Sequence, residues 1–463
     1  MIKVGGQRIP GVTFLIIGTE SALIGLALFV ATFLRGGLGA GTAPAIDMYQ
    51  AIERLLVVVV VCELALYYYD LYDFQVVSRR TILFVNLVRA LGVSCLILGV
   101  VYYIEPKLSL GRGVAAMAAP VIVMVILGWR LLLDASAPLI RRGERLLMLG
   151  TGSAGTQLVK EIANRSEFGF KVEGFLNDQP GAILPGDVNV IGDASELEAI
   201  VTERKIERVI ISLSERRGRM PVRELLHLKF AGIQIQEVHS LFETISGRIL
   251  LEHVAPSWFI LSDGFRKSGF LLAAKRALDI SVAVIALLLA APVMVITALL
   301  IMIEDGRPVL FRQKRVGMSG REFEMLKFRS MYKDSEKHGP KWAGDVDHRV
   351  TKIGRFIRTY RIDELPQMIN VLLGDMSLIG PRPEQPIFVR QLEEQIPYYG
   401  LRHSVRPGIT GWAQVKFRYA ASVEDSKTKL EYDLFYIKHL SIVLDLAIMF
   451  ETLKVLLSGR GAK

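Results

Sequence analysis

The sequence has few of the residues that support disulfide, metal or nucleic-acid chemistry. Only two of its 463 residues are cysteines, and both Cys62 and Cys95 lie in apolar runs, which favours lipid-facing or core positions over a disulfide or metal pair. Its 7 histidines show no ligand spacing such as HxxxH. No nucleic-acid recognition motif accompanies the net charge of +10, so we expect no nucleic-acid partner. That charge suits anionic lipids and phosphorylated substrates.

The sequence also lacks the balance of an ordinary soluble enzyme. Hydrophobic residues make up 51% of it and charged residues 22%, so membrane and soluble parts must alternate. No small-residue cleavage site follows the first apolar run, which we therefore expect to be retained rather than removed as a signal peptide. The length allows two or three domains.

Apolar runs fill the first third of the chain, and each approaches the roughly 20 residues that span a bilayer. They are Val12–Leu34, Leu55–Tyr72, Leu83–Ile104 and Val114–Leu133. The second contains Glu63, and a carboxylate inside a membrane indicates either a functional site or a contact with a neighbouring helix or partner. The placement of lysine and arginine favours both ends of this region in the cytosol. We predict a four-helix transmembrane domain over residues 1–140.

Residues 141–265 are predicted to form a Rossmann-like α/β domain. Gly150, Gly152 and Gly155 stand between a predicted strand and a predicted helix, where GxGxxG places a pyrophosphate at a helix N-terminus. The acid Asp178 lies about 28 residues after Gly150, against the usual roughly 20. Three interpretations of this candidate nucleotide loop stay open. The module binds nothing, it binds a regulator, or it is a catalytic NAD site. The absence of tyrosine between residues 145 and 262 argues against a Tyr-x-x-x-Lys oxidoreductase.

A further apolar stretch, Leu278–Ile303, is long enough to span a bilayer. Both of its flanks are rich in lysine and arginine, which places both in the cytosol by the positive-inside rule. Pro292 near its middle can kink a helix back on itself. We therefore predict a re-entrant membrane helix over residues 275–303, within a mainly α domain over residues 266–463 whose function the following motifs indicate.

The chain after Glu304 contains a dense series of short polar motifs. They are FRQKRVG, KFRSM, GRFIR, DELPQ, GDMS, GPRP and RPGITGWAQ. The pair Asp363-Glu364 precedes a predicted helix, so its carboxylates cannot share one face; one can attack while the other holds a metal. Arginines around the pair, among them Arg361 and Arg382, match phosphate oxygens. Alternatively, Asp363 caps the helix and the arginines form a solvated face against anionic lipid.

From Lys275 to Leu457 these motifs, in this order, resemble the bacterial sugar transferase family, the monotopic phosphoglycosyl transferases. With its four apolar runs and Rossmann-like insert, the whole chain resembles the large members that start exopolysaccharide synthesis on undecaprenyl phosphate. One departure is Ala291 before Pro292, where serine is common in the family.

The resemblance implies a two-step mechanism. Asp363 would attack the sugar-linked phosphorus of a UDP-sugar, release UMP and carry a covalent phosphosugar, which undecaprenyl phosphate then accepts. Glu364 would bind Mg²⁺, the expected cofactor. Arg358 and Arg418 match arginines that contact substrate phosphate. Arg382, Lys327 and Arg329 are further candidates for substrate binding.

The resemblance also implies a place and partners for the protein. We expect a multi-pass protein of the bacterial cytoplasmic membrane, with its catalytic domain on the cytosolic face, in contact with membrane lipids and able to form a homodimer. Lys275, Arg276 and Asp279 match a motif at the start of the membrane helix, where we expect anchoring; Asp445 matches a family acid without an assigned role. A non-catalytic scaffold of an export complex is the alternative outside enzymes.

Overall fold

The computed structural model describes residues 2–457 except 5–6, 10, 39–47, 70, 73–79, 110–111, 141–142, 166–167, 178–188, 214–219, 252–255, 333–348 and 418–421. Its contacts form two compact units, which divide between Glu237 and Val238. The second unit also includes Lys3–Gln7. The sequence placed the border before the catalytic domain at 265/266, so residues 238–265 are found with the catalytic segment instead.

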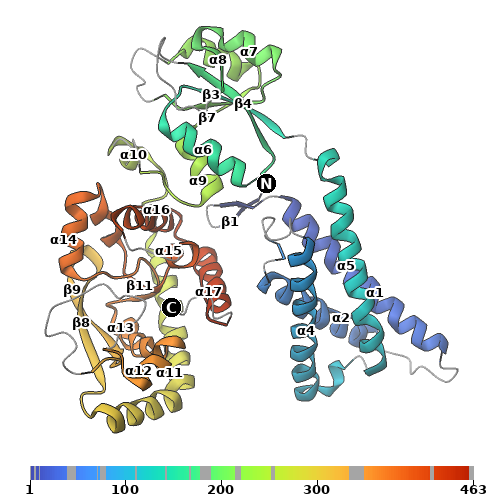
Figure 1. Cartoon of the computed structure of the whole chain (residues 1–463), viewed down its shortest axis with the longest axis vertical. Helices are drawn as coiled ribbons and strands as arrows, with labels where there is room; N and C mark the ends of the chain where they lie inside the picture. Colours follow the sequence, from blue (N-terminus) through green and yellow to red (C-terminus); the bar gives the residue numbers. More distant parts are fainter. Residues whose placement is uncertain are drawn as a thin grey trace. The chain divides into compact units, whose positions relative to one another are not determined.

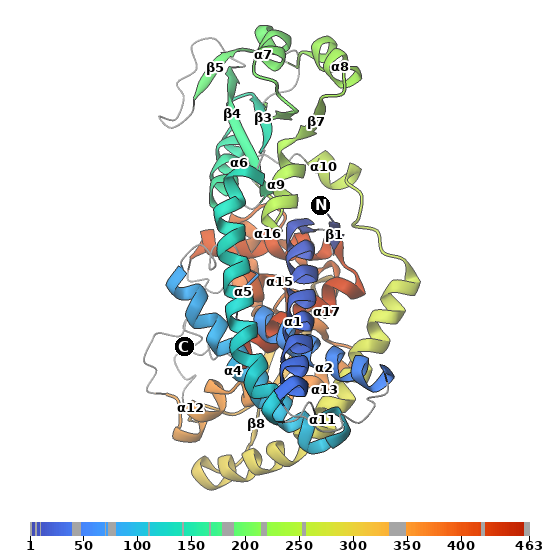
Figure 2. The ribbon, with the colours of Figure 1, turned by 90° about the vertical axis from the view of Figure 1, so that its right-hand side faces the viewer.

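The first unit begins with long helices at the expected places. Their bounds are α1 (Gly11–Leu38), α2 (Met48–Tyr68), α4 (Arg80–Ile104) and α5 (Arg112–Ile140), after the short strands β1 (Ile2–Val4) and β2 (Gln7–Ile9). Figure 1 and Figure 2 show α1 and α5 side by side. Buried apolar residues of all four helices form one core, which includes Ile24, Leu66, Leu87 and Ile126.

By length and composition, three helices of the described chain can cross a membrane, so the chain is a membrane protein. Two of them, Phe14–Phe33 and Leu83–Ile104, match the first and third predicted runs. Met117–Leu133 is a shorter apolar helix, and the second predicted run lies within α2, which is not one of the three. The four-helix transmembrane domain therefore stays a prediction.

Polar side chains meet inside this helical core. Glu63 of α2 accepts hydrogen bonds from Ser21 of α1, at 2.9 Å, and from Tyr72. Glu20 pairs with Arg130 of α5, with 2.7 Å between Oε1 and Nε. Of the two predicted roles of Glu63, the contact with a neighbouring helix is the one that these bonds show.

The remainder of the first unit is a parallel sheet of order β5-β4-β3-β6-β7. The strands are β3 (Glu144–Leu149), β4 (Phe170–Asn177), β5 (Val190–Asp193), β6 (Arg208–Ile211) and β7 (Gln234–Glu237), and the helices are α6 (Ser153–Asn164), α7 (Leu197–Glu203) and α8 (Val222–Phe230). Leucines, isoleucines and valines of α7 and α8 pack on one face, and Figure 1 shows α6 on the other. This doubly wound order confirms the predicted Rossmann-like sheet.

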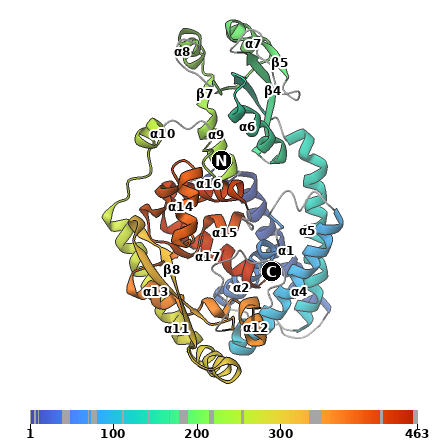
Figure 3. The same cartoon turned by 60° about the vertical axis from the view of Figure 1, so that its left-hand side comes forward.

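The second unit starts with helices that lead into the longest helix of the protein. They are α9 (Val238–Ser246), α10 (Pro256–Leu261) and α11 (Gly269–Asp305). Pro292 lies inside α11, and Figure 1 and Figure 3 show this helix changing direction before its C-terminal end. A proline removes one helical hydrogen bond and bends the axis, so the sequence accounts for this change.

The catalytic segment after α11 combines a hairpin with short helices. Its elements are β8 (Leu310–Val316), β9 (Glu322–Phe328), α12 (Lys352–Thr359), α13 (Gln367–Leu373), β10 (Ser377–Ile379), α14 (Pro386–Gln395), β11 (Gly408–Thr410), α15 (Trp412–Lys416), α16 (Val423–His439) and α17 (Ile442–Leu457). β8 and β9 pair antiparallel, and β10 and β11 pair parallel. Trp412, Phe435 and Tyr436 lie in its central core.

Polar contacts explain why α9 belongs to this unit. The indole Nε1 of Trp412 donates to the carbonyl of Gly247 at 2.8 Å. Arg248 pairs with the buried Glu431 at 2.8 Å, and Glu243 of α9 accepts from Lys438 of α16 at 2.7 Å. Removal of α9 and of the two residues that follow it, Gly247 and Arg248, would leave buried polar groups of this unit without these partners, at a cost of about 1–3 kcal/mol each.

Candidate functional site

Asp363 and Glu364 lie in a single 3₁₀ turn, Ile362–Glu364, between α12 and α13. The turn begins after Arg361, which adopts a left-handed conformation with φ of 54°. Pro366, not Asp363, is the N-cap of α13, so the capping alternative for Asp363 is not what the structure shows. The turn leaves Asp363 buried, with 8% of its surface exposed, and presents Glu364 to a set of cations.

Glu364 is surrounded by three basic side chains from different elements. Arg382 Nη2 donates to Glu364 Oε1 at 2.7 Å, and Lys327 Nζ of β9 lies 3.7 Å from the same oxygen. Arg361 Nη1 lies 3.6 Å from Oε2. Burial favours the neutral acid, but the charges of Arg382 and Lys327 outweigh it and lower the pKa of Glu364 to about 2.

Asp363 has the opposite environment. Burial and the neighbouring charge of Glu364 raise the pKa of Asp363, against the positive charges of Lys327 and Arg358. Adjacent carboxylates with pKa values pushed apart by their surroundings are typical of sites where two acids take different roles. The geometry therefore distinguishes Asp363 from Glu364 more sharply than their adjacency in sequence does.

Lys327 connects the two carboxylates electrostatically. Its ammonium group acts on both Asp363 and Glu364, and burial, together with the charge of Arg382, lowers the pKa of Lys327 to about 8. A buried lysine with such a pKa carries its charge at neutral pH and loses it in mildly alkaline solution.

Of the other arginines predicted to bind phosphate, Arg358 lies near Asp363, whereas Arg329 contacts the end of α11. Arg358 of α12 donates through Nε to Ser330 Oγ at 2.8 Å and acts on Asp363 through its charge. Arg329 instead donates to the carbonyls of Gly306, at 2.7 Å, and Asp305, at 3.0 Å, so it holds the chain that leaves α11. Arg418 lies outside the described residues. Its role and that of Arg329 in substrate binding stay predictions.

Glycines of two motifs hold the loop that carries Arg382. A Cβ on Gly380 would lie 2.4 Å from the carbonyl oxygen of Arg406, and one on Gly411 would lie 2.1 Å from that of Gly380. No side chain fits at such distances, so GPRP and RPGITGWAQ pack backbone to backbone. This close contact fixes the position of the Arg382 loop beside Glu364.

Two segments of the chain are similar to known protein families, and the chain has named relatives. Residues 270–459 match the family model of bacterial sugar transferases, and residues 68–228 match one described as a CoA-binding domain. The UDP-N-acetylgalactosamine-undecaprenyl-phosphate N-acetylgalactosaminephosphotransferase of Aeromonas hydrophila is 47% identical over 241 residues, 52% of this chain and 56% of that protein. The undecaprenyl-phosphate glucose phosphotransferase of Komagataeibacter xylinus is 36% identical over 329 residues, 70% of this chain and 60% of that protein.

A shorter relative is matched over most of its length. The UDP-glucose:undecaprenyl-phosphate glucose-1-phosphate transferase of Caulobacter vibrioides is 40% identical over 190 residues, 41% of this chain and 71% of that protein. The chain belongs to the bacterial sugar transferase family. The alignments cover 56% and 60% of the first two relatives, so the family is established by the catalytic segment rather than by whole-length similarity.

In this sugar transferase, the motif at the start of α11 has the anchoring contacts that we expected. Lys275 Nζ donates to Asp445 Oδ2 of α17 at 2.8 Å, and Arg276 donates to the carbonyl of Leu372 at 3.0 Å. Asp279 accepts from the backbone N–H of Leu378 at 3.1 Å. Asp445, whose role the sequence left open, thus holds α11 against α17.

The glycine-rich loop lies in the other unit of the sugar transferase. Gly150 follows β3 with φ of +95°, and a Cβ there would lie 2.9 Å from the backbone nitrogen of Leu213. Gly152 is the N-cap of α6, and Gly155 packs against Ser212, which follows β6. The loop is therefore at the switch point between β3 and β6, where doubly wound sheets bind ligands. Asp178 lies outside the described residues.

The described residues contain no group of three or more histidine, cysteine or acidic side chains that could hold a metal ion. A Mg²⁺ site does not require three such protein ligands, because one or two carboxylates, substrate phosphates and water together complete the coordination shell. Arg361 is 3.6 Å from Glu364 Oε2, too long for a hydrogen bond, so this oxygen can accept a metal ion. The donor set thus fits Mg²⁺ held by Glu364 and a substrate diphosphate.

Sequence reasoning missed the contact of Arg361 with Glu364 and the support that Ser330 gives to Arg358. Arg361 was one of many arginines near the pair, and only the left-handed turn aims it at Glu364. Ser330 lies three residues after Lys327 in the motif KFRSM. Its place in that motif is the feature of the sequence that could have indicated a role near the site.

Proposed function

We propose that the chain transfers a sugar-1-phosphate from a UDP-sugar to undecaprenyl phosphate and releases UMP. This would be the first membrane step in the synthesis of an exopolysaccharide or other glycoconjugate. The observation that carries the proposal is the Asp363-Glu364 turn, in which one carboxylate is buried and the other is held ionised by cations of three elements. The activities for which the relatives are named support the same reaction class.

In the first step, an ionised oxygen of Asp363 attacks the sugar-linked phosphorus of the donor. An oxygen–phosphorus bond forms to Asp363 while the bond from that phosphorus to the bridging oxygen breaks. The electron pair of the broken bond leaves with UMP. Burial supports this role, because a carboxylate with few water contacts and a raised pKa is a stronger nucleophile than a hydrated one.

In the second step, a phosphate oxygen of undecaprenyl phosphate attacks the same phosphorus. The bond to Asp363 breaks, its electron pair returns to the carboxylate, and the product is undecaprenyl-diphospho-sugar. Covalent catalysis of this kind divides one difficult displacement into two easier ones.

The surrounding cations would stabilise the charge that moves during both steps. Lys327 and Arg382 are held by Glu364, Arg358 is held by Ser330, and the close packing of Gly380 and Gly411 fixes the loop that carries Arg382. These cations therefore need no reorganisation when phosphate oxygens arrive. Glu364 would hold Mg²⁺, which when bound would neutralise negative charge on the diphosphate and on the departing phosphate.

We propose further that α11 enters the membrane and returns to the same face. Lys275 and Arg276 anchor its first half. In its last turn, the carboxylate of Glu304 accepts a hydrogen bond from the backbone N–H of Lys352 at 2.8 Å. Ile301 packs with Phe328 and Ile357. Both ends thus contact the same compact unit, whereas a straight helix of 37 residues would separate them by about 55 Å.

The middle of α11 supports this placement. Its long apolar side chains are largely exposed, among them Leu288 at 72% and Leu289 at 76%. Such a surface suits lipid, and a helix with both ends in the cytosol would keep Asp363 at the interface where a lipid phosphate meets a cytosolic sugar nucleotide. We place the protein accordingly in the bacterial cytoplasmic membrane.

Release of UMP by the full-length protein in nanodiscs tests the proposal. A panel of UDP-sugars that begins with UDP-glucose and UDP-N-acetylgalactosamine is supplied with Mg²⁺ and undecaprenyl phosphate.

Without the acceptor, mass spectrometry should find one phosphosugar on the peptide that contains Asp363, and Asp363→Asn should abolish both the adduct and UMP release. The exposed acid Glu394→Gln is the matched control. Turnover with sequential kinetics and no adduct would exclude the covalent mechanism.

A further inference from the structure

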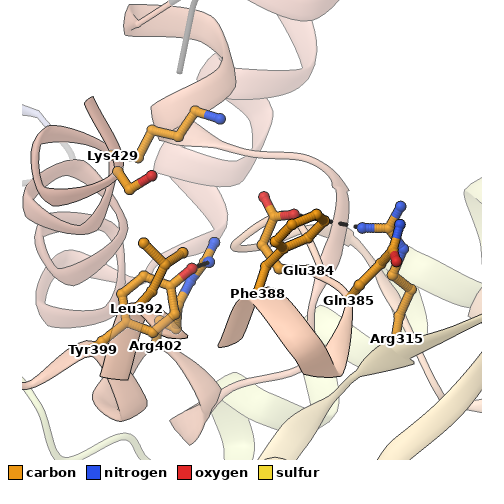
Figure 4. A pocket seen from close by; sticks show the side chains of 9 residues that line it. Arg315, Glu384, Gln385, Phe388, Leu392, Tyr399, Arg402 and Lys429 are labelled. Carbon is orange, nitrogen blue, oxygen red and sulfur yellow. Dashed lines mark hydrogen bonds and ion pairs between the residues drawn. The ribbon is translucent and has the colours of Figure 1, made fainter. Parts of the chain in front are cut away.

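A polar cavity lies beside the loop that carries Arg382. It has a volume of about 200 Å³ and is lined by side chains from β8, α14, α16 and the loops between them. The lining residues with polar or aromatic chemistry include Arg315, Glu384, Phe388, Tyr399, Arg402 and Lys429. Figure 4 shows Lys429 and Arg315 on opposite sides of the cavity, with Phe388 between them.

The cavity and the carboxylate site share one loop. The side chain of Arg382 donates to Glu364, while its carbonyl accepts from Arg402 Nη2 at 3.0 Å. The next residue, Pro383, accepts from Arg315 Nη1 at 3.0 Å through its carbonyl. Two residues of the cavity wall, Arg402 and Arg315, therefore hold the loop that places Arg382 beside Glu364.

Two of the three cations in the cavity wall are already neutralised. Arg402 Nη2 lies 2.8 Å from Asp433 Oδ2, and its Nη1 donates to Tyr399. Arg315 Nη1 lies 3.5 Å from Glu384 Oε2. These arginines build the wall and support one another through carboxylates of the protein.

Lys429 differs from both arginines. Within the described part of the chain, no carboxylate lies within ion-pair distance of its ammonium group. Burial lowers the pKa of Lys429; the charges of Glu384 and Asp433 act against this shift, and those of Arg402 and Arg382 act with it. A partly buried ammonium group that forms no ion pair is stabilised when an anion arrives. The three cations Arg315, Arg402 and Lys429 stand against the two carboxylates of Glu384 and Asp433, so one positive charge is left over, which an anion in the cavity would neutralise.

We propose that this cavity binds the nucleotide half of the sugar donor, with Lys429 on the phosphate that leaves as UMP and Phe388 against the pyrimidine base. The inference rests on the proposed function and names the residues that recognise its leaving group. A phosphate supplies the missing anion, whereas the sugar is neutral and needs no ammonium group. Aromatic rings stack on bases, and a cavity smaller than the roughly 300–1,000 Å³ of sites for drug-sized ligands fits part of the donor rather than all of it.

Binding of UMP alone tests this without requiring turnover. Full-length protein in nanodiscs is titrated with UMP by calorimetry, as wild type and as Lys429→Gln. We expect the variant to bind UMP about tenfold more weakly, because one charge-assisted hydrogen bond is lost. Lys427→Gln is the matched control: it removes the same charge from α16, but Lys427 pairs with Glu424 at 3.5 Å and does not line the cavity, so its affinity should stay within about twofold.

Steady-state kinetics provide the second measurement. For Lys429→Gln we expect the KM for the UDP-sugar to rise about tenfold while the KM for undecaprenyl phosphate stays unchanged. Lys429→Arg should restore most of the affinity, and Phe388→Leu should weaken UMP binding while it leaves inorganic phosphate binding unaffected.

The outcomes separate the two proposals. A wild-type protein that releases UMP, together with a Lys429→Gln variant whose UMP affinity and donor KM are unchanged, would overturn the cavity assignment alone. So would a variant that loses discrimination between sugars but binds UMP normally, because the cavity would then hold the sugar. A wild-type protein that neither binds UMP nor releases it from any UDP-sugar would overturn the proposed function itself.

Discussion

At the scale of single residues, the site depends on two adjacent carboxylates in unlike surroundings. Glu364 is bound by Arg382 and stays ionised, whereas Asp363 is buried beside it and has its pKa raised. Lys327 acts on both, and its own pKa of about 8 lies within the range of ordinary assays. The pH dependence of turnover should therefore report on these groups.

We expect a bell-shaped dependence of kcat/KM for UMP release on pH. Activity should fall as pH drops through the pKa of Asp363, because the proposed nucleophile must be ionised, and this limb should lie above the usual range of an aspartate, since burial and Glu364 raise that pKa. Activity also falls as pH rises through about 8, because Lys327 loses its charge. Lys327→Arg should move the alkaline limb upward by at least about one pH unit, since arginine stays protonated, and leave the acid limb in place.

The exposed Lys314→Arg serves as the control for that profile. An alkaline limb that does not move in Lys327→Arg would show that another group titrates there.

Glu364→Gln tests the assignment of the metal to this carboxylate. We expect kcat to fall on the order of a hundredfold and the Mg²⁺ concentration for half-maximal activity to rise, because a neutral amide is a poorer ligand than a carboxylate. UMP release is measured against Mg²⁺ after treatment with EDTA, which should abolish activity in the wild type. An unchanged Mg²⁺ requirement in the variant would place the metal elsewhere.

At the scale of elements, α11 is the segment whose role depends most on its contacts. Length and hydropathy alone make it a candidate membrane span. Its two ends nevertheless bind the same unit, through Asp445 at one end and Arg329 at the other. These polar contacts are what favour a return to the same face.

Single cysteines at Asp263 and Arg321 test the topology of α11. Both positions are exposed and flank the helix, and the native Cys62 and Cys95 are replaced by alanine. In intact cells an impermeant maleimide should label neither site, and after lysis it should label both. Labelling of Arg321→Cys from outside would mean that α11 crosses the membrane.

At the scale of the whole molecule, phosphate chemistry and the glycine-rich loop belong to separate compact units. All motifs around Asp363 lie in the second unit, and Gly150, Gly152 and Gly155 lie in the first. We therefore expect a change in the loop to affect the stability of the first unit rather than the chemical step.

Gly150→Ala should destabilise the first unit by about 1–3 kcal/mol, because φ is +95° and the backbone of Leu213 is too close for a Cβ. Gly169→Ala is the control, with φ of +66° but nothing within 4 Å, and it should cost about 1 kcal/mol. Thermal unfolding measures stability, and kcat of the folded protein should stay within about twofold of wild type. Loss of turnover in folded Gly150→Ala would couple the loop to catalysis.

Much of the fold could be predicted from the sequence because its causes are local. The apolar runs, the strand–Gly–helix pattern and Pro292 inside a long apolar helix each depend on neighbouring residues, and the structure has helices, a parallel sheet and a bent helix there. The anchoring role of Lys275 and Asp279 also followed from their motif.

Other features required the tertiary structure because they join residues far apart in the chain. The sequence could not show that Arg329 holds the end of α11 while Lys327, two residues earlier, points at Glu364. Nor could it show that the residue after α9, Gly247, accepts a hydrogen bond from Trp412, which lies far along the chain.

The sequence by itself determined the chemical composition of the site: an adjacent carboxylate pair, many arginines and lysines, and glycines in fixed motifs. The tertiary structure decided that Asp363 is buried, that cations surround Glu364, and that Lys429 forms no ion pair among the described residues although Glu384 and Asp433 lie near it. The physical reason is that charge interactions and burial act through space over a few ångströms. Those distances depend on how β9, α12, α16 and the Arg382 loop pack, not on the order of their residues in the chain.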